Sequence, residues 1–248
     1  MSSARKLSRI EVFPTLDSTS LEAKRRAGLG EGGPLWIVAL RQTAGYGRRG
    51  TEWVQTEGDI AATFLFRAEG SQERLPELSF VAALALADAV RKFAPRAALS
   101  FKWPNDLLAG GAKIAGLLLE LVGDAPLVAL GCGVNIVSAP KGLAYPTARL
   151  LDVIDAAPPA PRQFVEALDE TFAFRRRQWS GEGFAPIRAE WLDGAESLGR
   201  PVRIETPAGL AEGLFEDLDL SGALILNSNG ERRVIAAGAV LPPASRRP

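Results

Sequence analysis

The run KIAGLLLEL, residues 113–121, is followed closely by a second apolar run, LVALGCGVNI, at residues 127–136. Both runs are typical of buried strands. They are joined through Gly123-Asp124-Ala125-Pro126, which suits a hairpin and leaves no room for a crossover helix. The sheet that contains them is therefore expected to be mixed and largely antiparallel.

Strands and helices alternate irregularly around this hairpin. The sequence predicts strands at 10–13, 35–40, 60–66 and 99–103, and helices at 21–26, 77–93, 162–179 and 184–192. The helix at 77–93 repeats apolar residues at helical spacing, as expected of a helix that packs on a sheet. Residues 138–161 are rich in Ala and Pro and lack a periodic pattern, which favours a surface connection. The predicted fold class is α+β.

The pattern changes after Gly194. Short strands are predicted at 202–204, 211–215, 223–226 and 232–235, separated by glycine-containing turns. Such spacing indicates a small β-barrel. We therefore predict two domains, one at residues 1–196 and a second at residues 197–248.

Composition excludes several kinds of chemistry. The chain of 248 residues has 29 Lys and Arg against 29 Asp and Glu, so no net charge draws it to nucleic acid or to a membrane. It contains no run of 18 apolar residues and no signal-type N-terminal segment, which favours a cytoplasmic protein. The absence of histidine excludes Ser-His-Asp and Cys-His catalysis. Cys132 is the single cysteine, so no internal disulfide forms.

The glycine loop, GYGRRGTEW at residues 45–53, combines features that a ligand would use. Its glycines permit a close backbone approach, Arg48 and Arg49 carry planar donors for anions, and Trp53 offers a flat face. A solvated turn with Trp53 in the core is the alternative. The loop also matches G-x-G-x-x-G, but no strand leads directly into it and no helical pattern follows, which disfavours a dinucleotide fold. An anion-binding flap between strands fits better.

Two further segments place charges or amides beside glycine. Lys102 and Lys113 flank a Pro-Asn-Asp turn, and Lys113 opens an apolar strand where its ammonium would need an anionic partner. Together with the two loop arginines, these lysines could converge on one anionic ligand. Asp106 suits a metal, an incoming amine or simple turn capping. Gly131 and Gly133 lie within a strand, which indicates close approach by a ligand or a backbone.

These segments resemble, in order and spacing, the biotin–protein ligases. The matching motifs are Asp17-Ser18-Thr19, residues 42–50 with Trp53, Lys102-Trp103-Pro104-Asn105-Asp106-Leu107, Lys113-Ile114-Ala115-Gly116 with Glu120, and residues 131–136. The resemblance implies a class II synthetase-like catalytic domain with a small SH3-like C-terminal barrel. It also implies an ATP- and Mg²⁺-dependent reaction in two steps. Biotin is activated as biotinyl-5′-AMP and then transferred to a lysine of a biotin-acceptor domain, such as the carboxyl carrier protein of acetyl-CoA carboxylase.

The resemblance also implies residue roles, whereas the metal ligands stay unknown. The expected catalytic residues are Arg48, Lys113, Lys102 and Asp106, and the roles of the last two are left open. The expected biotin contacts are Ser18, Thr19, Ser20, Gln42, Gly45, Tyr46, Gly47, Arg48, Lys113, Gly116, Gly131 and Gly133. The expected adenylate contacts are Arg48, Arg49, Trp53, Asn105, Lys113 and Asn135.

The chain departs from the family pattern at several positions. Tyr46 and Thr51 replace two arginines of the usual loop, and Ser20 and Asp59 stand where Asn is usual. We expect Arg48 to suffice and Tyr46 to pack on the ligand. About nine residues precede the first predicted strand, so a DNA-binding domain and a repressor role are not expected.

The sequence is also compatible with other functions. One is a lipoate or octanoate transferase of the same superfamily, and another is a non-catalytic biotin or nucleotide sensor. A plain β-rich interaction module fits the clustered cations least well. Either a monomer or a homodimer is compatible with the sequence.

Overall fold

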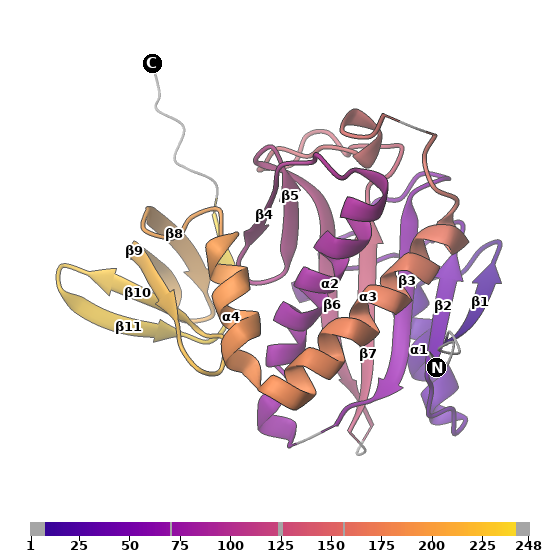
Figure 1. Ribbon diagram of the computed structural model, residues 1–248, viewed down its shortest axis with the longest axis horizontal. Coiled ribbons are helices and arrows are strands. Elements are labelled where there is room, and N and C mark those ends of the chain that lie inside the picture. Colours follow the sequence, from indigo (N-terminus) through magenta and orange to yellow (C-terminus); the bar gives the residue numbers. More distant parts are fainter. Residues whose placement is uncertain (1–7, 70, 124–125, 156, 242–248) are drawn as a thin grey trace, which may run out of the picture.

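The computed structural model describes residues 8–241, apart from 70, 124–125 and 156. The chain forms two sheets with four α-helices in the described part (Figure 1). Within these residues, no helix combines the length and apolarity that a membrane crossing requires.

The first part of the chain supplies the larger sheet and the α-helices. Its strands are β1 (Arg9–Phe13), β2 (Leu35–Ala39), β3 (Ile60–Arg67), β4 (Leu99–Lys102), β5 (Asp106–Ala109), β6 (Ala112–Val122) and β7 (Leu127–Val134). Its helices are α1 (Thr19–Gly28), α2 (Glu77–Phe93), α3 (Pro161–Glu182) and α4 (Phe184–Asp193), with 3₁₀ turns η1 (Arg48–Gly50), η2 (Gln72–Arg74) and η3 (Leu150–Asp152).

The seven strands follow the order β1-β2-β3-β7-β6-β5-β4. Only the β1–β2 pair within this sheet is parallel, and the other pairs are antiparallel. The β6–β7 hairpin lies inside the sheet, because β7 also pairs with β3 and β6 also pairs with β5. Asp124 and Ala125 of the connecting turn lie outside the described residues. The α+β class with a mixed, largely antiparallel sheet is confirmed.

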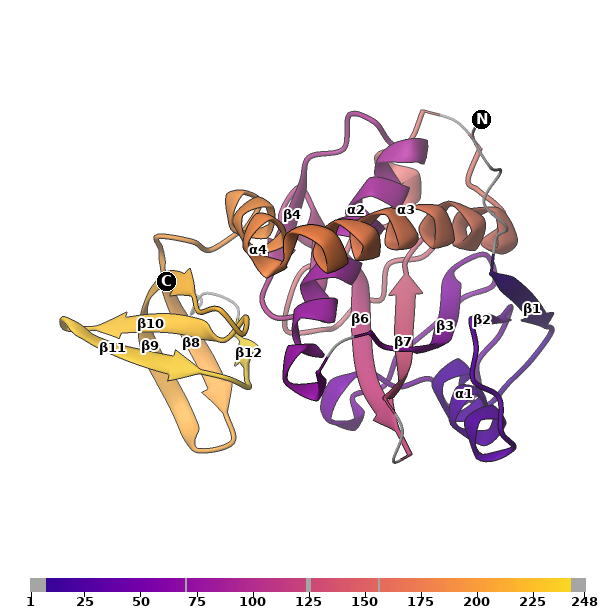
Figure 2. The ribbon, with the colours of Figure 1, turned by 60° about the horizontal axis from the view of Figure 1, so that its bottom comes forward.

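The helices lie on opposite faces of this sheet. In the rotated view α2 and α3 cover one face, and α1 lies on the other beside β2 and β3 (Figure 2). The core beneath α2 and α3 is rich in aromatic rings. Phe64 stacks on Trp36 at 4.6 Å between ring centroids and meets Phe172 of α3 edge-on at 5.8 Å. The face beside α1 is less fully covered, and the site described below opens there.

Most predicted elements agree with the structure within a few residues. Two short strands were missed, β5 and, in the C-terminal sheet described below, β12 (Ala239–Val240). The four residues of β5 begin with an aspartate and follow a turn directly. The helix α1 begins after Ser18, whose Oγ accepts from the amide of Leu21 at 3.4 Å and so caps the N-terminus of the helix. The segment 138–161 contains η3 and a single bridge from Thr147 to Lys113, and otherwise it is a connection.

The C-terminal strands form a five-stranded antiparallel sheet. They are β8 (Pro201–Thr206), β9 (Gly209–Leu218), β10 (Leu224–Ser228), β11 (Glu231–Ile235) and β12 (Ala239–Val240), in the order β11-β10-β9-β8-β12. This sheet contacts the rest of the chain directly. The indole Nε1 of Trp103 donates to the carbonyl of Gly222 at 3.2 Å, and Arg188 of α4 donates to the carbonyl of Leu218. The boundary at residues 196/197 stays a prediction.

The aromatic core gives a first testable prediction. The substitution Phe64→Ala removes a buried ring from the stack on Trp36 and should lower the free energy of unfolding by about 3–5 kcal/mol. Urea unfolding followed by circular dichroism measures this change. The matched control is Phe174→Ala on α3, a side chain that is 56% exposed and should change stability by about 0.5 kcal/mol or less. Equal losses in the two variants would contradict this account of the core.

Candidate functional site

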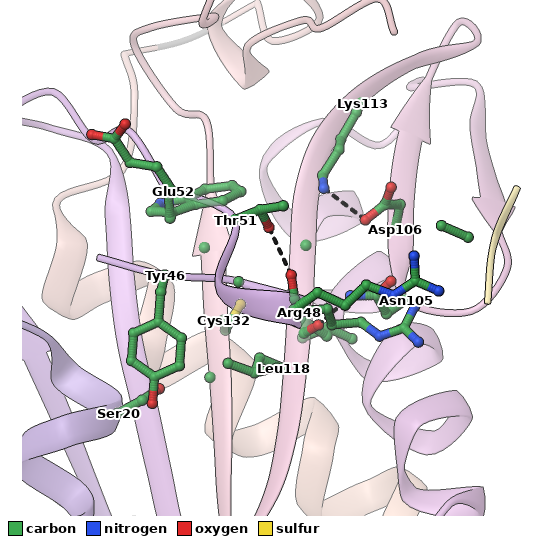
Figure 3. Close-up of a pocket in the computed structure, with 18 of the residues that line it drawn as sticks. Ser20, Tyr46, Arg48, Thr51, Glu52, Asn105, Asp106, Lys113, Leu118 and Cys132 are labelled. Carbon is green, nitrogen blue, oxygen red and sulfur yellow. Dashed lines mark hydrogen bonds and ion pairs between the residues drawn. The ribbon is translucent and has the colours of Figure 1, made fainter. Parts of the chain in front are cut away.

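A cavity of about 330 Å³ opens between the face of the large sheet beside α1 and the C-terminal sheet. Its wall is formed by α1, the glycine loop, β6, β7 and the turn before β5. Residues 239–241, which comprise β12 and the residue after it, also line the cavity. Figure 3 shows Ser20 and Tyr46 at one end of the cavity and Arg48, Asp106 and Lys113 toward the other. The cavity therefore has a hydroxyl end, with Ser20 and Tyr46, and a cationic end, with Arg48 and Lys113.

The glycine loop folds over this cavity as a compact flap. The amide of Gly47 donates to the carbonyl of Thr51 at 2.7 Å, and the amide of Trp53 donates to the carbonyl of Gly45 at 2.9 Å. Arg49 takes a left-handed conformation with φ of 56°, which turns the chain at the tip of the loop. The loop connects β2 to β3 and is thus a flap between strands, as predicted. A dinucleotide-binding turn would lead into a helix, and no helix follows this loop.

Several hydroxyl groups lie close together at the hydroxyl end of the cavity. Both the amide and the Oγ1 of Thr19 donate to Oε1 of Gln42, at 2.8 and 3.1 Å. Thr63 of β3 donates to the hydroxyl of Thr19 at 2.9 Å and lies 3.1 Å from the hydroxyl of Ser20. Because these groups are buried and orient one another, they present fixed donors and acceptors to a polar ligand.

The cationic end contains an ion pair between β5 and β6. Lys113 Nζ lies 2.7 Å from Oδ1 of Asp106, and the two side chains are only 14% and 13% exposed. The same ammonium lies 5.8 Å from the centre of the Trp53 ring and 5.3 Å from the centre of the Tyr145 ring, within range of a cation–π interaction with each. Lys102 Nζ lies 5.2 Å from the same Tyr145 ring.

Two more cations are held with little solvent around them. Burial, followed by repulsion from Arg49, lowers the pKa of Arg48, and burial lowers the pKa of Lys102 despite the attraction of Asp106. Burial disfavours the charged form of each group, so an anion bound beside them would stabilise both. In the structure the guanidinium of Arg48 donates to the carbonyl of Gly238 at 2.9 Å.

Glycines on the cavity wall make room for neighbouring side chains. A Cβ at Gly133 would lie 2.3 Å from Trp53 Cε2, and a Cβ at Gly131 would lie 3.0 Å from the hydroxyl of Ser20. A Cβ at Gly116 would lie 3.1 Å from Lys113 Nζ. These positions therefore let the Trp53 ring lie flat against β7 and let Lys113 reach the cavity.

Most of the residues predicted for the site line this one cavity. They are Ser18, Thr19, Ser20, Gln42, Tyr46, Gly47, Arg48, Arg49, Trp53, Lys102, Asn105, Asp106, Lys113, Gly116, Gly131 and Gly133. The structure thus brings together cations from the glycine loop, β4 and β6.

Two predicted residues do not line the cavity. Gly45 packs against the side chain of Gln42, where a Cβ would lie 2.5 Å from Nε2. Asn135 is 3% exposed, and its amide donates to the carbonyls of Lys113 and Ala148 at 3.4 and 3.1 Å. Both residues support the wall from behind, and direct ligand contact by either stays a prediction.

Sequence reasoning missed other parts of the wall. Tyr145 belongs to the segment interpreted as a plain connection, although an aromatic residue next to Pro146 could have drawn attention to it. Glu205 of β8 and residues 239–241 also line the cavity. Glu205 binds the loop, since Arg49 donates to its Oε2 at 2.9 Å and to its carbonyl at 3.1 Å. Pairing between distant parts of the chain gives no local sequence signal.

The carboxylates around the cavity do not form a ready-made metal site. In the described part of the chain, no three His, Cys, Asp or Glu side chains gather closely enough to hold a metal ion. Asp106 is paired with Lys113, and Glu205 is paired with Arg49. Cys132 also lines the cavity and is 3% exposed.

The sequence matches two known families. Residues 13–136 match the Biotin/lipoate A/B protein ligase family, and residues 197–241 match the Biotin protein ligase C terminal domain. A Biotin--[acetyl-CoA-carboxylase] ligase of Paracoccus denitrificans is 42% identical over 239 residues, covering 90% of this chain and 96% of the relative. A protein of the same name from Mycobacterium tuberculosis is 33% identical, covering 94% of this chain and 88% of the relative.

A solved structure shares the fold. The biotin protein ligase from Aquifex aeolicus, solved in complex with biotin and ATP, superposes with a TM-score of 0.82. It is 21% identical in sequence, and the match covers 94% of this chain and 97% of that one. The large sheet and the C-terminal sheet are thus arranged in this chain as in a known structure.

The thiol of Cys132 gives a prediction about reactivity. Burial raises the pKa of Cys132 to about 12, and the thiolate is the reactive form. At pH 8 the folded protein should therefore react with iodoacetamide roughly a thousandfold more slowly than an exposed thiol with a pKa of about 8.5. Mass spectrometry of the alkylated chain measures the rate, with the urea-unfolded protein as control. Similar rates in the folded and unfolded protein would show that the thiol is not held neutral.

Proposed function

The chain belongs to the biotin/lipoate A/B protein ligase family, and we propose that it attaches biotin to a specific lysine of a biotin-acceptor protein in an ATP-dependent reaction. The acceptor class is a carboxyl carrier domain such as that of acetyl-CoA carboxylase. The proposal is supported by one cavity that is lined by four cations from three separate segments and, at its other end, by hydroxyl groups. The family match of the C-terminal residues favours biotin over lipoate.

The two ends of the cavity suit different parts of the reactants in the activation step. The biotin ring system carries neutral hydrogen-bonding groups, which suit the hydroxyls of Thr19 and Ser20. The biotin carboxylate and the ATP phosphates are anions that repel each other, so cations must offset that repulsion. A carboxylate oxygen forms a bond to the α-phosphorus, and the bond to pyrophosphate breaks. Arg48 and Lys113 would stabilise the charge that develops around this phosphorus.

The nucleoside would bind near the aromatic rings. Trp53 and Tyr145 both lie close to the Lys113 ammonium, so their rings can contact a ligand bound there. The indole Nε1 of Trp53 is buried and has no hydrogen-bond partner among the described residues. A bound group that accepts from this donor would remove the cost of leaving it unpaired.

The second step transfers the acyl group to the acceptor. The ε-amine of the acceptor lysine attacks the carbonyl carbon of biotinyl-5′-AMP, AMP leaves, and the amine loses a proton. Asp106 is the carboxylate placed beside the cations to accept that proton or to orient the amine. Lys102, whose ammonium is buried, would balance the phosphate charge. The glycine loop would keep water away from the anhydride until the acceptor arrives.

Magnesium would arrive with the nucleotide. Mg²⁺ prefers hard oxygen ligands and is commonly held by substrate phosphates with one or two carboxylates. The carboxylate of Asp106 fits that chemistry, and the pairing of Asp106 with Lys113 and of Glu205 with Arg49 fits an ion held mainly by ATP. The ion would neutralise phosphate charge, while Arg48, Lys102 and Lys113 would orient the reacting groups.

A transfer assay tests the proposal. The protein is incubated with biotin, Mg-ATP and a biotin-acceptor domain, and the acceptor lysine is examined by mass spectrometry. The expected result is the mass gain of one biotinyl group. A parallel incubation with lipoate tests the transferase alternative, and pyrophosphate release separates a ligase from a sensor that only binds its ligands. No mass gain with correctly folded protein would refute the proposal.

Removal of the Lys113 charge should be costly. We expect Lys113→Met to lower kcat/KM for biotin transfer by about 10²–10³, because a lost transition-state donor typically costs about 2–4 kcal/mol. The matched control is Lys92→Met, since Lys92 lies on α2 and pairs with Glu170 far from the cavity. Steady-state kinetics measure both variants. The assignment of Lys113 is wrong if both variants keep the activity of the unaltered protein.

A further inference from the structure

Tyr46 connects the glycine loop to two other elements of the fold. Its hydroxyl donates to Oε2 of Glu120 on β6 at 3.0 Å and accepts from the ammonium of Lys24 on α1 at 3.0 Å. Lys24 and Glu120 also form an ion pair of 2.8 Å. Each of the three groups therefore contacts the other two.

This triangle is partly screened from solvent. The side chains of Lys24 and Glu120 are 36% and 23% exposed, and the Lys24 ammonium lies 5.5 Å from the centre of the Tyr46 ring. Burial alone would lower the pKa of Lys24, yet the bonds to Glu120 and Tyr46 raise it. Hydrogen bonds that involve charged partners are stronger than neutral ones, so the triangle holds the loop firmly.

The other side of the loop is attached to the C-terminal sheet. Arg48 donates to the carbonyl of Gly238, and Arg49 binds Glu205 through two hydrogen bonds. The loop is thus held at Tyr46 on one side and at its arginines on the other. The arginines would have to turn toward an anionic ligand to bind it, whereas the Tyr46 contacts lie at the other end of the cavity and can persist.

We propose that Lys24, Tyr46 and Glu120 form a latch that holds the glycine loop closed over the cavity, with Tyr46 as the positioning residue. The consequence for function rests on the proposed ligase activity: the latch would retain the acyl-adenylate until the acceptor lysine arrives. Tyr46 lies at the end of the cavity near Ser20, away from the Lys113–Asp106 pair (Figure 3).

The chemistry of the hydroxyl explains why a tyrosine serves this position. A phenol can donate to the carboxylate of Glu120 and accept from the ammonium of Lys24 at the same time. An arginine has only donors and would place a second positive charge beside Lys24. Where the family loop usually carries a charged arginine, this chain therefore has a neutral side chain, Tyr46, that bridges an ion pair.

Hydrogen exchange of the ligand-free protein tests the latch directly. In the loop, the amides of Gly47 and Trp53 donate to loop carbonyls, so their exchange reports loop opening. Tyr46→Phe keeps the ring and removes both hydroxyl bonds, and we expect these amides to exchange about tenfold faster. The matched control is Tyr145→Phe, the same change at the chain's other tyrosine, which should leave loop exchange unaltered.

A second variant and a second measurement complete the test. Lys24→Met should speed loop exchange to a similar extent, and thermal unfolding checks that each variant is folded. The half-time for release of biotinyl-5′-AMP should shorten about tenfold in Tyr46→Phe. The latch is overturned if loop exchange in Tyr46→Phe and Lys24→Met equals that of the unaltered protein. Failure to form any adenylate, with the exchange result intact, would count against the ligase function and leave the latch standing.

Discussion

The confinement of several positive charges in one partly buried cavity is the constraint on which the rest of the structure depends. Asp106 offsets the charge of Lys113, but Arg48 and Lys102 are partly buried and, among the described residues, neither forms an ion pair with a carboxylate. Charges in such surroundings are costly unless an anion joins them. The hairpin of β6 and β7, the glycine walls and the attached C-terminal sheet all serve to hold these groups near one another.

The fold was largely predictable because its determining signals are local. The short connection after β6 excludes a crossover helix, and the apolar repeat of α2 predicts its bounds correctly. β5 and β12 were missed because strands of four and two residues carry too little pattern. The parallel pairing of β1 with β2 depends on contacts across the sheet, which hydrophobic periodicity does not encode.

The candidate site was predictable where its residues belong to ordered motifs, and unpredictable where it depends on tertiary contacts. Arg48 and Lys113 both belong to these motifs, and both line the same cavity. Glu205 gave no signal, because its contact with Arg49 joins residues 156 positions apart. The expected packing of Tyr46 on the ligand stays a prediction, whereas the structure shows that the hydroxyl of Tyr46 binds Lys24 and Glu120. Such a role becomes visible only when distant elements are placed side by side.

The most direct measurement is the exchange of labelled pyrophosphate into ATP without any acceptor protein. The central claim is that the cations bring a carboxylate and an α-phosphate together, and this exchange reports the reversal of that single step. We predict exchange that requires biotin and is absent with biotin amide, which has the same ring system but no carboxylate. Absence of exchange with biotin, or equal exchange with the amide, would contradict the account.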